Sequence, residues 1–195
     1  CIAAKRFLVA DSLYGEFSRR YTEAFRTRVS GDPMLPSTDI GPLARPDLAQ
    51  ELAAQVKESV RLGAVLLCGG EYDSSNKDNA FYPPTVLANV RPGMPAFDQE
   101  MFGPVAALIR VHNEEEAIGL ANQSRFGLGS GVFTRDPERA LRVASRLQAG
   151  NCAINDFVRS DPRLPFGGVK ESGYGRELSH LGLREFTNIQ SVLIG

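Results

Sequence analysis

The sequence contains little cysteine, few histidines and no metal-binding spacing. Its three cysteines, Cys1, Cys68 and Cys152, are widely separated and odd in number, and no Cys-x-x-Cys pair occurs. With only His112 and His180 to assist, we expect neither a disulfide framework nor a metal site. The chain is therefore predicted to be a reduced, cytoplasmic protein, in which Cys68 and Cys152 are buried as small apolar side chains.

An excess of one charge sign and a long apolar run are also missing. The chain of 195 residues carries 22 basic and 23 acidic side chains, so its net charge is −1. This balance argues against nucleic acid or an anionic membrane as partner. No run approaches the ~18 apolar residues of a membrane-spanning helix, and no signal peptide is visible. With 43% hydrophobic residues, the length suits one soluble domain, or one domain and a fragment.

Familiar nucleotide-binding motifs are absent as well. No Gly-x-x-x-x-Gly-Lys-Ser/Thr sequence occurs, which excludes a P-loop. The glycine-rich stretch 127–131 does not match Gly-x-Gly-x-x-Gly, and it precedes an expected strand instead of following one. The chain therefore has no dinucleotide fingerprint of its own.

Apolar runs of strand length alternate with amphipathic, helical segments along the chain. We expect a helix from Asp11 or Ser12 to the break at Gly31, with its apolar stripe on every fourth residue. That stripe comprises Leu13, Phe17, Tyr21, Phe25 and Val29. The other expected helices cover residues 47–62, 113–122, 136–149 and 178–186, and the expected strands cover residues 7–10, 64–68, 105–111, 131–134, 152–155 and 189–194. This alternation predicts an α/β fold with a mostly parallel sheet flanked by helices on both faces.

Two local segments allow both a structural and a functional interpretation. The segment 100–105, Glu-Met-Phe-Gly-Pro-Val, joins a loop to a strand. Its Glu100 is either a solvated surface charge or an acceptor for sugar hydroxyls with an aromatic ring beside it. The glycine-rich segment 166–177 is either a tight structural loop or a place where the backbone approaches a ligand or a neighbouring domain.

Four segments in order resemble the aldehyde dehydrogenase superfamily, most closely its succinate-semialdehyde dehydrogenase branch. They are Cys-Ile-Ala-Ala-Lys-Arg-Phe at 1–7, Glu-Met-Phe-Gly-Pro-Val at 100–105, the stretch 149–155, and Pro-Phe-Gly-Gly-Val-Lys-Glu-Ser-Gly at 165–173. The resemblance implies a catalytic thiol domain over residues 1–185 and an oligomerisation strand over 186–195. Family members are more than twice as long, so the nucleotide-binding domain and the general-base Glu are expected outside this chain.

The resemblance also implies roles for particular residues. Cys1 would be the nucleophile that attacks the aldehyde, forming a thiohemiacetal and then a thioester. Glu100 would hold the ribose hydroxyls of NAD or NADP, and Phe102 would lie beside the nicotinamide. Asn155 would support the catalytic loop. The expected activity is oxidation of a semialdehyde, foremost succinate semialdehyde, although the isolated chain is expected to be inactive.

For the substrate pocket, the resemblance implies that Ser160 hydrogen-bonds the distal carboxylate of the aldehyde and that Phe166 forms an apolar wall. Arg159 and Arg163 flank Ser160 and either add positive charge there or remain in solvent. The terminal segment resembles the strand by which family members join subunits, which implies a homodimer or homotetramer.

Two alternatives remain open from the sequence. Cys1 could act as the nucleophile of an N-terminal-nucleophile amidohydrolase, with its α-amino group as the base. Such enzymes are built from layered antiparallel sheets, which the alternating pattern does not favour. A non-catalytic module that associates through the terminal strand is the second alternative.

Overall fold

The computed structural model describes residues 3–195 and divides them into two compact units. The first unit is Ala4–Ala117, and the second unit is Ile118–Gly195 together with Ala3. Helix α4 (Glu114–Asn122) spans the point of division. The sequence predicts another boundary, between a catalytic domain that ends at residue 185 and an oligomerisation strand that begins at residue 186. That boundary stays a prediction.

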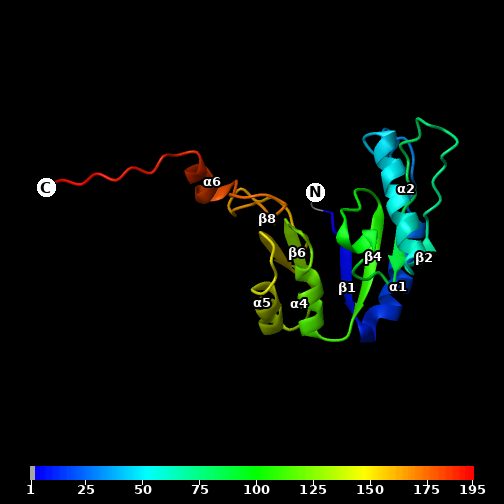
Figure 1. Cartoon of the computed structure of the whole chain (residues 1–195), viewed down its shortest axis with the longest axis horizontal. Coiled ribbons are helices and arrows are strands. Elements are labelled where there is room, and N and C mark those ends of the chain that lie inside the picture. The colour runs from blue at the N-terminus through cyan, green and yellow to red at the C-terminus, as the bar shows by residue number, and fades with distance from the viewer. Residues whose placement is uncertain (1–2) are drawn as a thin grey trace. The chain divides into compact units, whose positions relative to one another are not determined.

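The first unit contains a four-stranded sheet in the order β1-β4-β3-β2 (Figure 1). Its strands are β1 (Arg6–Ala10), β2 (Val65–Cys68), β3 (Thr85–Ala88) and β4 (Val105–Val111). Central β4 pairs in parallel with both β1 and β3, whereas β2 pairs antiparallel with β3 at the edge. Only Arg110 of β4 is exposed, as expected of a central strand covered on both faces.

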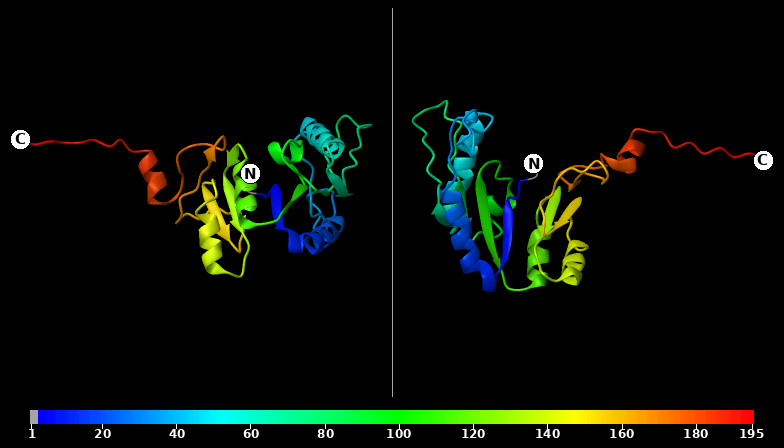
Figure 2. Two further views of the ribbon diagram at one scale, coloured as in Figure 1. Left: turned by 60° about the horizontal axis from the view of Figure 1, so that its bottom comes forward. Right: turned by 180° about the vertical axis from the view of Figure 1, so that it is seen from behind.

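Helices cover both faces of this sheet, as predicted. Helix α1 (Asp11–Arg26) lies on one face, where Tyr14 packs into a cluster with Val9, Val86 and Leu108. Because side chains alternate along strands, Leu87, Ala107 and Ile109 point to the opposite face, and all three are buried. Helices α2 (Pro46–Arg61) and α3 (Pro95–Asp98) pack together, and the left view of Figure 2 shows α1 and α2 on opposite sides of the sheet.

The predicted apolar stripe of α1 is confirmed at its centre and fails at its two ends. Phe17, Tyr21 and Phe25 are partly buried and pack against the Tyr14 cluster. Leu13 is 62% exposed, and Val29 lies beyond the end of the helix. The most buried residues of the helix are Tyr14, Ser18 and Thr22. A four-residue repeat exceeds one helical turn by about 40° at each step, so the ends of a long stripe rotate away from the core. Tyr14 is fixed instead, because its hydroxyl donates to Leu108 O (3.3 Å) and accepts from Asn89 N (2.9 Å).

The second unit is built from short elements. Strands β6 (Gly129–Val132) and β7 (Asn151–Ile154) pair in parallel, and α5 (Pro137–Ala144) packs on both of them. Strands β5 (Phe126–Gly127) and β8 (Val169–Lys170) pair antiparallel, and α6 (Ser179–Glu185) follows. The predicted strands at 131–134 and 152–155 are thus found, shifted by one or two residues.

The terminal segment after α6 contains no strand within the described residues of this single chain. The expected strand at 189–194 is instead an exposed, extended tail, drawn in red in Figure 1. A strand needs a partner for its backbone groups, and no segment of the same unit supplies one. The role of residues 186–195 in joining subunits stays a prediction.

Candidate active site

The segment Glu100–Val105 presents an acid and an aromatic ring on either side of a buried anchor. Met101 is fully buried, whereas Glu100 is exposed and Phe102 is 49% exposed. Gly103 lies so close to α2 that a Cβ atom there would approach Leu52 Cδ2 to 2.4 Å. The glycine therefore permits the close packing that fixes this turn just before β4, with Glu100 and Phe102 facing outward.

Two cations, one just before β1 and one at its first residue, face aromatic rings in the stretch that precedes β4. The Lys5 Nζ atom lies 5.2 Å from the Phe102 ring centroid, and Arg6 Cζ lies 5.0 Å from that of Phe97. Burial lowers the pKa of Lys5, while the negative charge of Glu100 acts in the opposite direction. The sequence motif identified Glu100 and Phe102 but did not reveal that Lys5 is their neighbour.

Asn155 is held in the second unit by a pair of hydrogen bonds that resembles a strand pairing. Its side-chain Oδ1 accepts from Thr134 N, and its Nδ2 donates to Thr134 O, both at 2.9 Å. Its backbone φ of 52° lies in the left-handed region, which Asn tolerates better than most residues. The loop that begins at Asp156 therefore starts from a fixed backbone position.

Ser160 lies in that loop, where it is exposed, between two arginines. Arg159 pairs with Asp156, and Arg163 pairs with Asp161 through its Nη2 at 2.6 Å. The Arg163 guanidinium holds the pKa of Asp161 well below its usual range. Both arginines are thus exposed to solvent, which is one of the two interpretations given for them above. Their positive charge is offset by the neighbouring carboxylates.

The glycine-rich loop is tight because backbone approaches backbone within the second unit. A Cβ atom at Gly150 would lie 1.8 Å from Gly167 O, and one at Gly167 would lie 2.7 Å from Gly175 O. The partly buried Phe166 exchanges two backbone hydrogen bonds of 2.8 Å with Glu177. These contacts account for the glycines structurally, and the role of Phe166 as a pocket wall stays a prediction.

The three cysteines have different outcomes. Cys1, the predicted nucleophile, lies outside the described residues. Cys68 is half-buried, and burial raises the pKa of its thiol. The expectation of a buried Cys152 was wrong, because the thiol belongs to an exposed residue of β7. In this short two-stranded sheet an apolar sequence run does not guarantee burial on both faces.

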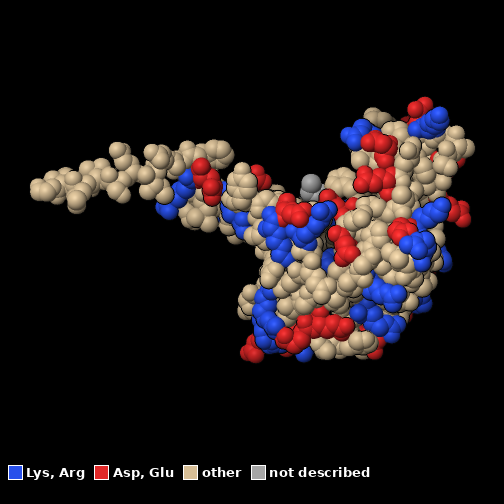
Figure 3. Space-filling view, in the orientation of Figure 1, with Lys and Arg blue, Asp and Glu red and all other residues tan. Residues whose placement is uncertain are grey.

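The described part of the chain contains neither a metal-ligand cluster nor a helix suited to a bilayer. Residues 3–195 contain no group of three or more His, Cys, Asp or Glu side chains that could hold a metal ion. None of the helices described there is both long and apolar enough to cross a bilayer. On the face seen in Figure 3, acidic and basic side chains are interspersed.

Comparison with known proteins identifies the family. The family model described as "Aldehyde dehydrogenase family" matches residues 1–192. The chain belongs to the aldehyde dehydrogenase family. This membership, together with the mostly parallel sheet, removes the basis for the amidohydrolase alternative.

Several named aldehyde dehydrogenases match all or nearly all of this chain. A probable succinate-semialdehyde dehydrogenase [NADP(+)] of Synechocystis is 47% identical over 194 residues, which are 100% of this chain and 42% of that protein. The succinate-semialdehyde dehydrogenase [NADP(+)] of Deinococcus radiodurans is 50% identical over 96% of this chain and 39% of its own length. The chain thus spans about two fifths of the curated relatives that it matches.

Solved aldehyde dehydrogenases share the fold. The succinic semialdehyde dehydrogenase of Streptococcus pyogenes, solved with NADP+, matches with a TM-score of 0.92 and 41% identity, over 100% of this chain and 42% of that one. The betaine aldehyde dehydrogenase of Staphylococcus aureus, solved with NAD+, gives a TM-score of 0.88 and 34% identity over 95% of this chain and 37% of its own. The predicted fold class is therefore confirmed.

Proposed function

We propose that this chain supplies the thiol-bearing part of an NAD(P)-dependent aldehyde dehydrogenase that oxidises a semialdehyde, foremost succinate semialdehyde. The observation that carries the proposal is the match of 96–100% of the chain to relatives named succinate-semialdehyde dehydrogenase at 47–50% identity. The four motifs at 1–7, 100–105, 149–155 and 165–173 lie within the matched region.

Cys1 is the proposed nucleophile. Its thiolate attacks the carbonyl carbon, and the electron pair of the C=O bond moves to oxygen, which gives a thiohemiacetal. Loss of a hydride from that carbon restores the C=O bond and leaves a thioester. Water then replaces the sulfur, which releases the acid and returns the thiol. Sulfur suits both steps, because a thiolate is strongly nucleophilic and is also a good leaving group.

NAD(P)+, when bound, supplies the acceptor for that hydride. The residues of the first unit fit such a cofactor, because an exposed carboxylate and a half-exposed ring stand on either side of a fully buried anchor. Glu100 would accept hydrogen bonds from ribose hydroxyls, and Phe102 would offer an apolar surface to the nicotinamide. Whether NAD or NADP is preferred depends on residues outside this chain.

Ser160 and Phe166 are the proposed substrate contacts. An exposed serine hydroxyl can donate to the distal carboxylate of succinate semialdehyde, and a partly buried ring can line the path of its methylene groups. Asn155 supports the Ser160 loop through its two hydrogen bonds to Thr134. We further propose that the enzyme acts in the cytoplasm as a homodimer or homotetramer, joined through residues 186–195.

The test uses a chimeric protein, in which this chain is joined to the part of the Deinococcus radiodurans relative that has no counterpart in it. The measured quantity is the reduced nicotinamide formed when an aldehyde is oxidised. We expect turnover of succinate semialdehyde that falls at least about a thousandfold in Cys1→Ser. Ser160→Ala should lower kcat/KM for succinate semialdehyde about tenfold and leave butyraldehyde, which lacks the carboxylate, unchanged.

Two controls complete this test. Ser74→Ala alters an exposed serine of the first unit and should change neither substrate. The 195-residue chain by itself should form no reduced nicotinamide. A joined protein that oxidises no aldehyde, or that keeps its activity in Cys1→Ser, would contradict the proposed function.

A further inference from the structure

Lys5 and the cofactor-binding segment meet because two parallel strands begin at the same edge of the sheet. Arg6 is opposite Ala107 in the register of β1 and β4, and Ala107 N donates to Lys5 O at 3.2 Å. The residues that precede the two strands are therefore neighbours in space, although about 95 positions separate them in sequence. Lys5 precedes β1, and the segment 100–104 precedes β4.

Two groups that attract a cation, an aromatic ring and a carboxylate, lie near the partly buried Lys5 ammonium. The ammonium lies 5.2 Å from the centroid of the Phe102 ring, at a distance where a cation is attracted to the ring face. The carboxylate of Glu100 is the charged group that favours its protonated form, against the effect of burial. One side chain thus interacts with both residues that the proposed function assigns to the cofactor.

The same arrangement is repeated one residue later. Arg6 Cζ lies 5.0 Å from the Phe97 ring, and Asp98 favours the charge of Arg6 as Glu100 favours that of Lys5. Each of the two successive cations thus lies near one aromatic ring and one carboxylate within residues 97–102. The difference is exposure: Phe97 is fully buried, whereas Phe102 is 49% exposed and has much of its ring free to meet a ligand.

We propose that Lys5 is a positioning residue for the nicotinamide cofactor, which holds the Phe102 ring and balances the Glu100 carboxylate so that both are presented in one arrangement. This inference rests on the proposed function. A half-exposed ring without a partner would sample several rotamers, and binding would have to select one of them at a cost in affinity. Lys5 removes part of that cost before the cofactor arrives.

Lys5 also stands four residues after Cys1 in the sequence. Lys5 therefore belongs to the sequence segment of the proposed nucleophile and contacts the segment 100–104, which is proposed to face the nicotinamide. Substitution of Lys5 should therefore lower cofactor affinity more than it lowers the stability of the sheet. The pairing of β1 with β4 depends on backbone groups, which a substitution leaves intact.

The experiment measures the dissociation constant of NADPH by its fluorescence, in the dehydrogenase joined as described above. Lys5→Met keeps the alkyl stem and removes the charge, and it should weaken NADPH binding about fivefold. Lys5→Arg, which keeps the charge, should stay within about twofold of the unsubstituted protein. Lys57→Met, on an exposed position of α2, is the matched control and should bind as tightly as the unsubstituted protein.

A double-mutant cycle separates positioning from a general loss of charge. In a Phe102→Leu background, Lys5→Met should weaken NADPH binding less than twofold further, because the ring that it holds is gone. Equal binding by Lys5→Met and Lys57→Met would overturn the inference, and so would failure of Lys5→Arg to restore affinity. A joined protein that binds no NADPH would instead overturn the proposed function.

A second measurement reads the Lys5 contact in the 195-residue chain itself, without cofactor. The pKa of Lys5 is followed by NMR of ε-carbon-labelled lysine, and Glu100→Gln should lower it, because the Glu100 charge favours the ammonium. Glu51→Gln, on the exposed surface of α2, should leave it unchanged. A Lys5 pKa that is the same in all three proteins would overturn the pairing on which the inference stands.

Discussion

The two units of this chain are stabilised in different ways. Nearly all of the buried apolar side chains belong to the first unit, where β4 is covered on both faces. Of the buried hydrophobic residues in the described chain, only Ile118 and Ala140 belong to the second unit. The second unit relies on close backbone approaches at glycines and on side chains that bind backbone groups, such as Lys170, which donates to Asn122 O and Ser124 O.

This difference predicts which substitutions each unit tolerates. An apolar core loses stability in proportion to the volume removed, and it accepts exchanges that conserve volume. A backbone crossing at a glycine accepts no side chain, because the atom that it meets is a carbonyl oxygen that cannot turn away. Deletion of core atoms should therefore cost the first unit more than the second, whose main sensitivity is to atoms added at its glycine crossings.

The largest effect is expected from Leu108→Ala in the first unit. Leu108 is fully buried in the cluster against α1, so its truncation should lower the free energy of unfolding by about 2–5 kcal/mol. Chemical denaturation measures this change, and hydrogen exchange assigns it to the first unit. Leu13→Ala, at a 62%-exposed position of α1, should cost less than about 0.5 kcal/mol. Equal losses in the two variants would break the comparison.

Gly150→Ala should give the next largest effect, and in the second unit. The new methyl group would lie 1.8 Å from Gly167 O, so the loop must shift, at a cost of about 1–3 kcal/mol. Hydrogen exchange should report faster opening of β6 and β7. Gly119→Ala is the matched control, because nothing lies within 4 Å of its Cβ position in α4, and it should stabilise that helix slightly. A stable Gly150→Ala protein would refute the tight-crossing account.

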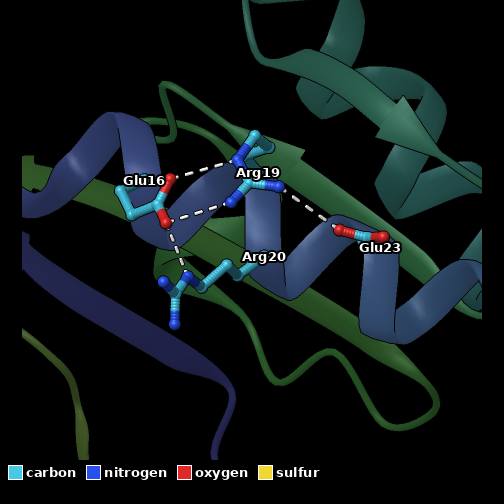
Figure 4. A network of polar contacts seen from close by, with 4 residues as sticks. All are labelled: Glu16, Arg19, Arg20 and Glu23. Carbon is cyan, nitrogen blue, oxygen red and sulfur yellow. Dashed lines mark hydrogen bonds and ion pairs between the residues drawn. The ribbon is translucent and has the colours of Figure 1, made fainter.

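Glu16→Gln should give the smallest effect, on the solvent side of α1. Figure 4 shows Glu16 bound by Arg19 and Arg20, which lower the pKa of its carboxyl from 4.5 to about 2. Because the folded pKa is the lower one, the contribution to stability is present above pH 4.5 and is lost as the pH falls towards 2. The difference in unfolding temperature between Glu16→Gln and the unsubstituted chain should vanish over that window. A difference that grows on acidification would contradict this sign.

The longest elements of the first unit could be predicted because they are long enough to show a period. The bounds of β4 agree with the predicted strand at 105–111, and α2 differs by one residue at each end. Helix α3 and strands β5 and β8 were not predicted, because elements of two to four residues carry no period and form only when the tertiary structure pairs them. The expected strand at 189–194 has no pairing partner among residues 3–195 of the single chain.

The candidate site was predictable only where a motif carries it. Glu100 and Phe102 belong to a recognisable hexapeptide, and the structure adds that both face outward from a buried anchor. Lys5 could not be linked to them, since sequence distance hides the shared edge of parallel strands. Local sequence also misjudged Cys152, because the burial of a two-stranded sheet depends on what packs against it.

The Asn155 side chain continues the β6–β7 pairing by one further step, using an amide of the side chain where a strand would use its backbone. The scaffold therefore ends at a defined residue. In the loop that follows, Phe157 and Val158 pack back on Phe133 and Gly129, whereas Ser160 is exposed, so an exchange at Ser160 leaves the anchor intact. Under the proposed function, exposed positions such as Ser160 are therefore the place to engineer specificity for a new aldehyde, because the hydrogen bonds of Asn155 do not depend on them.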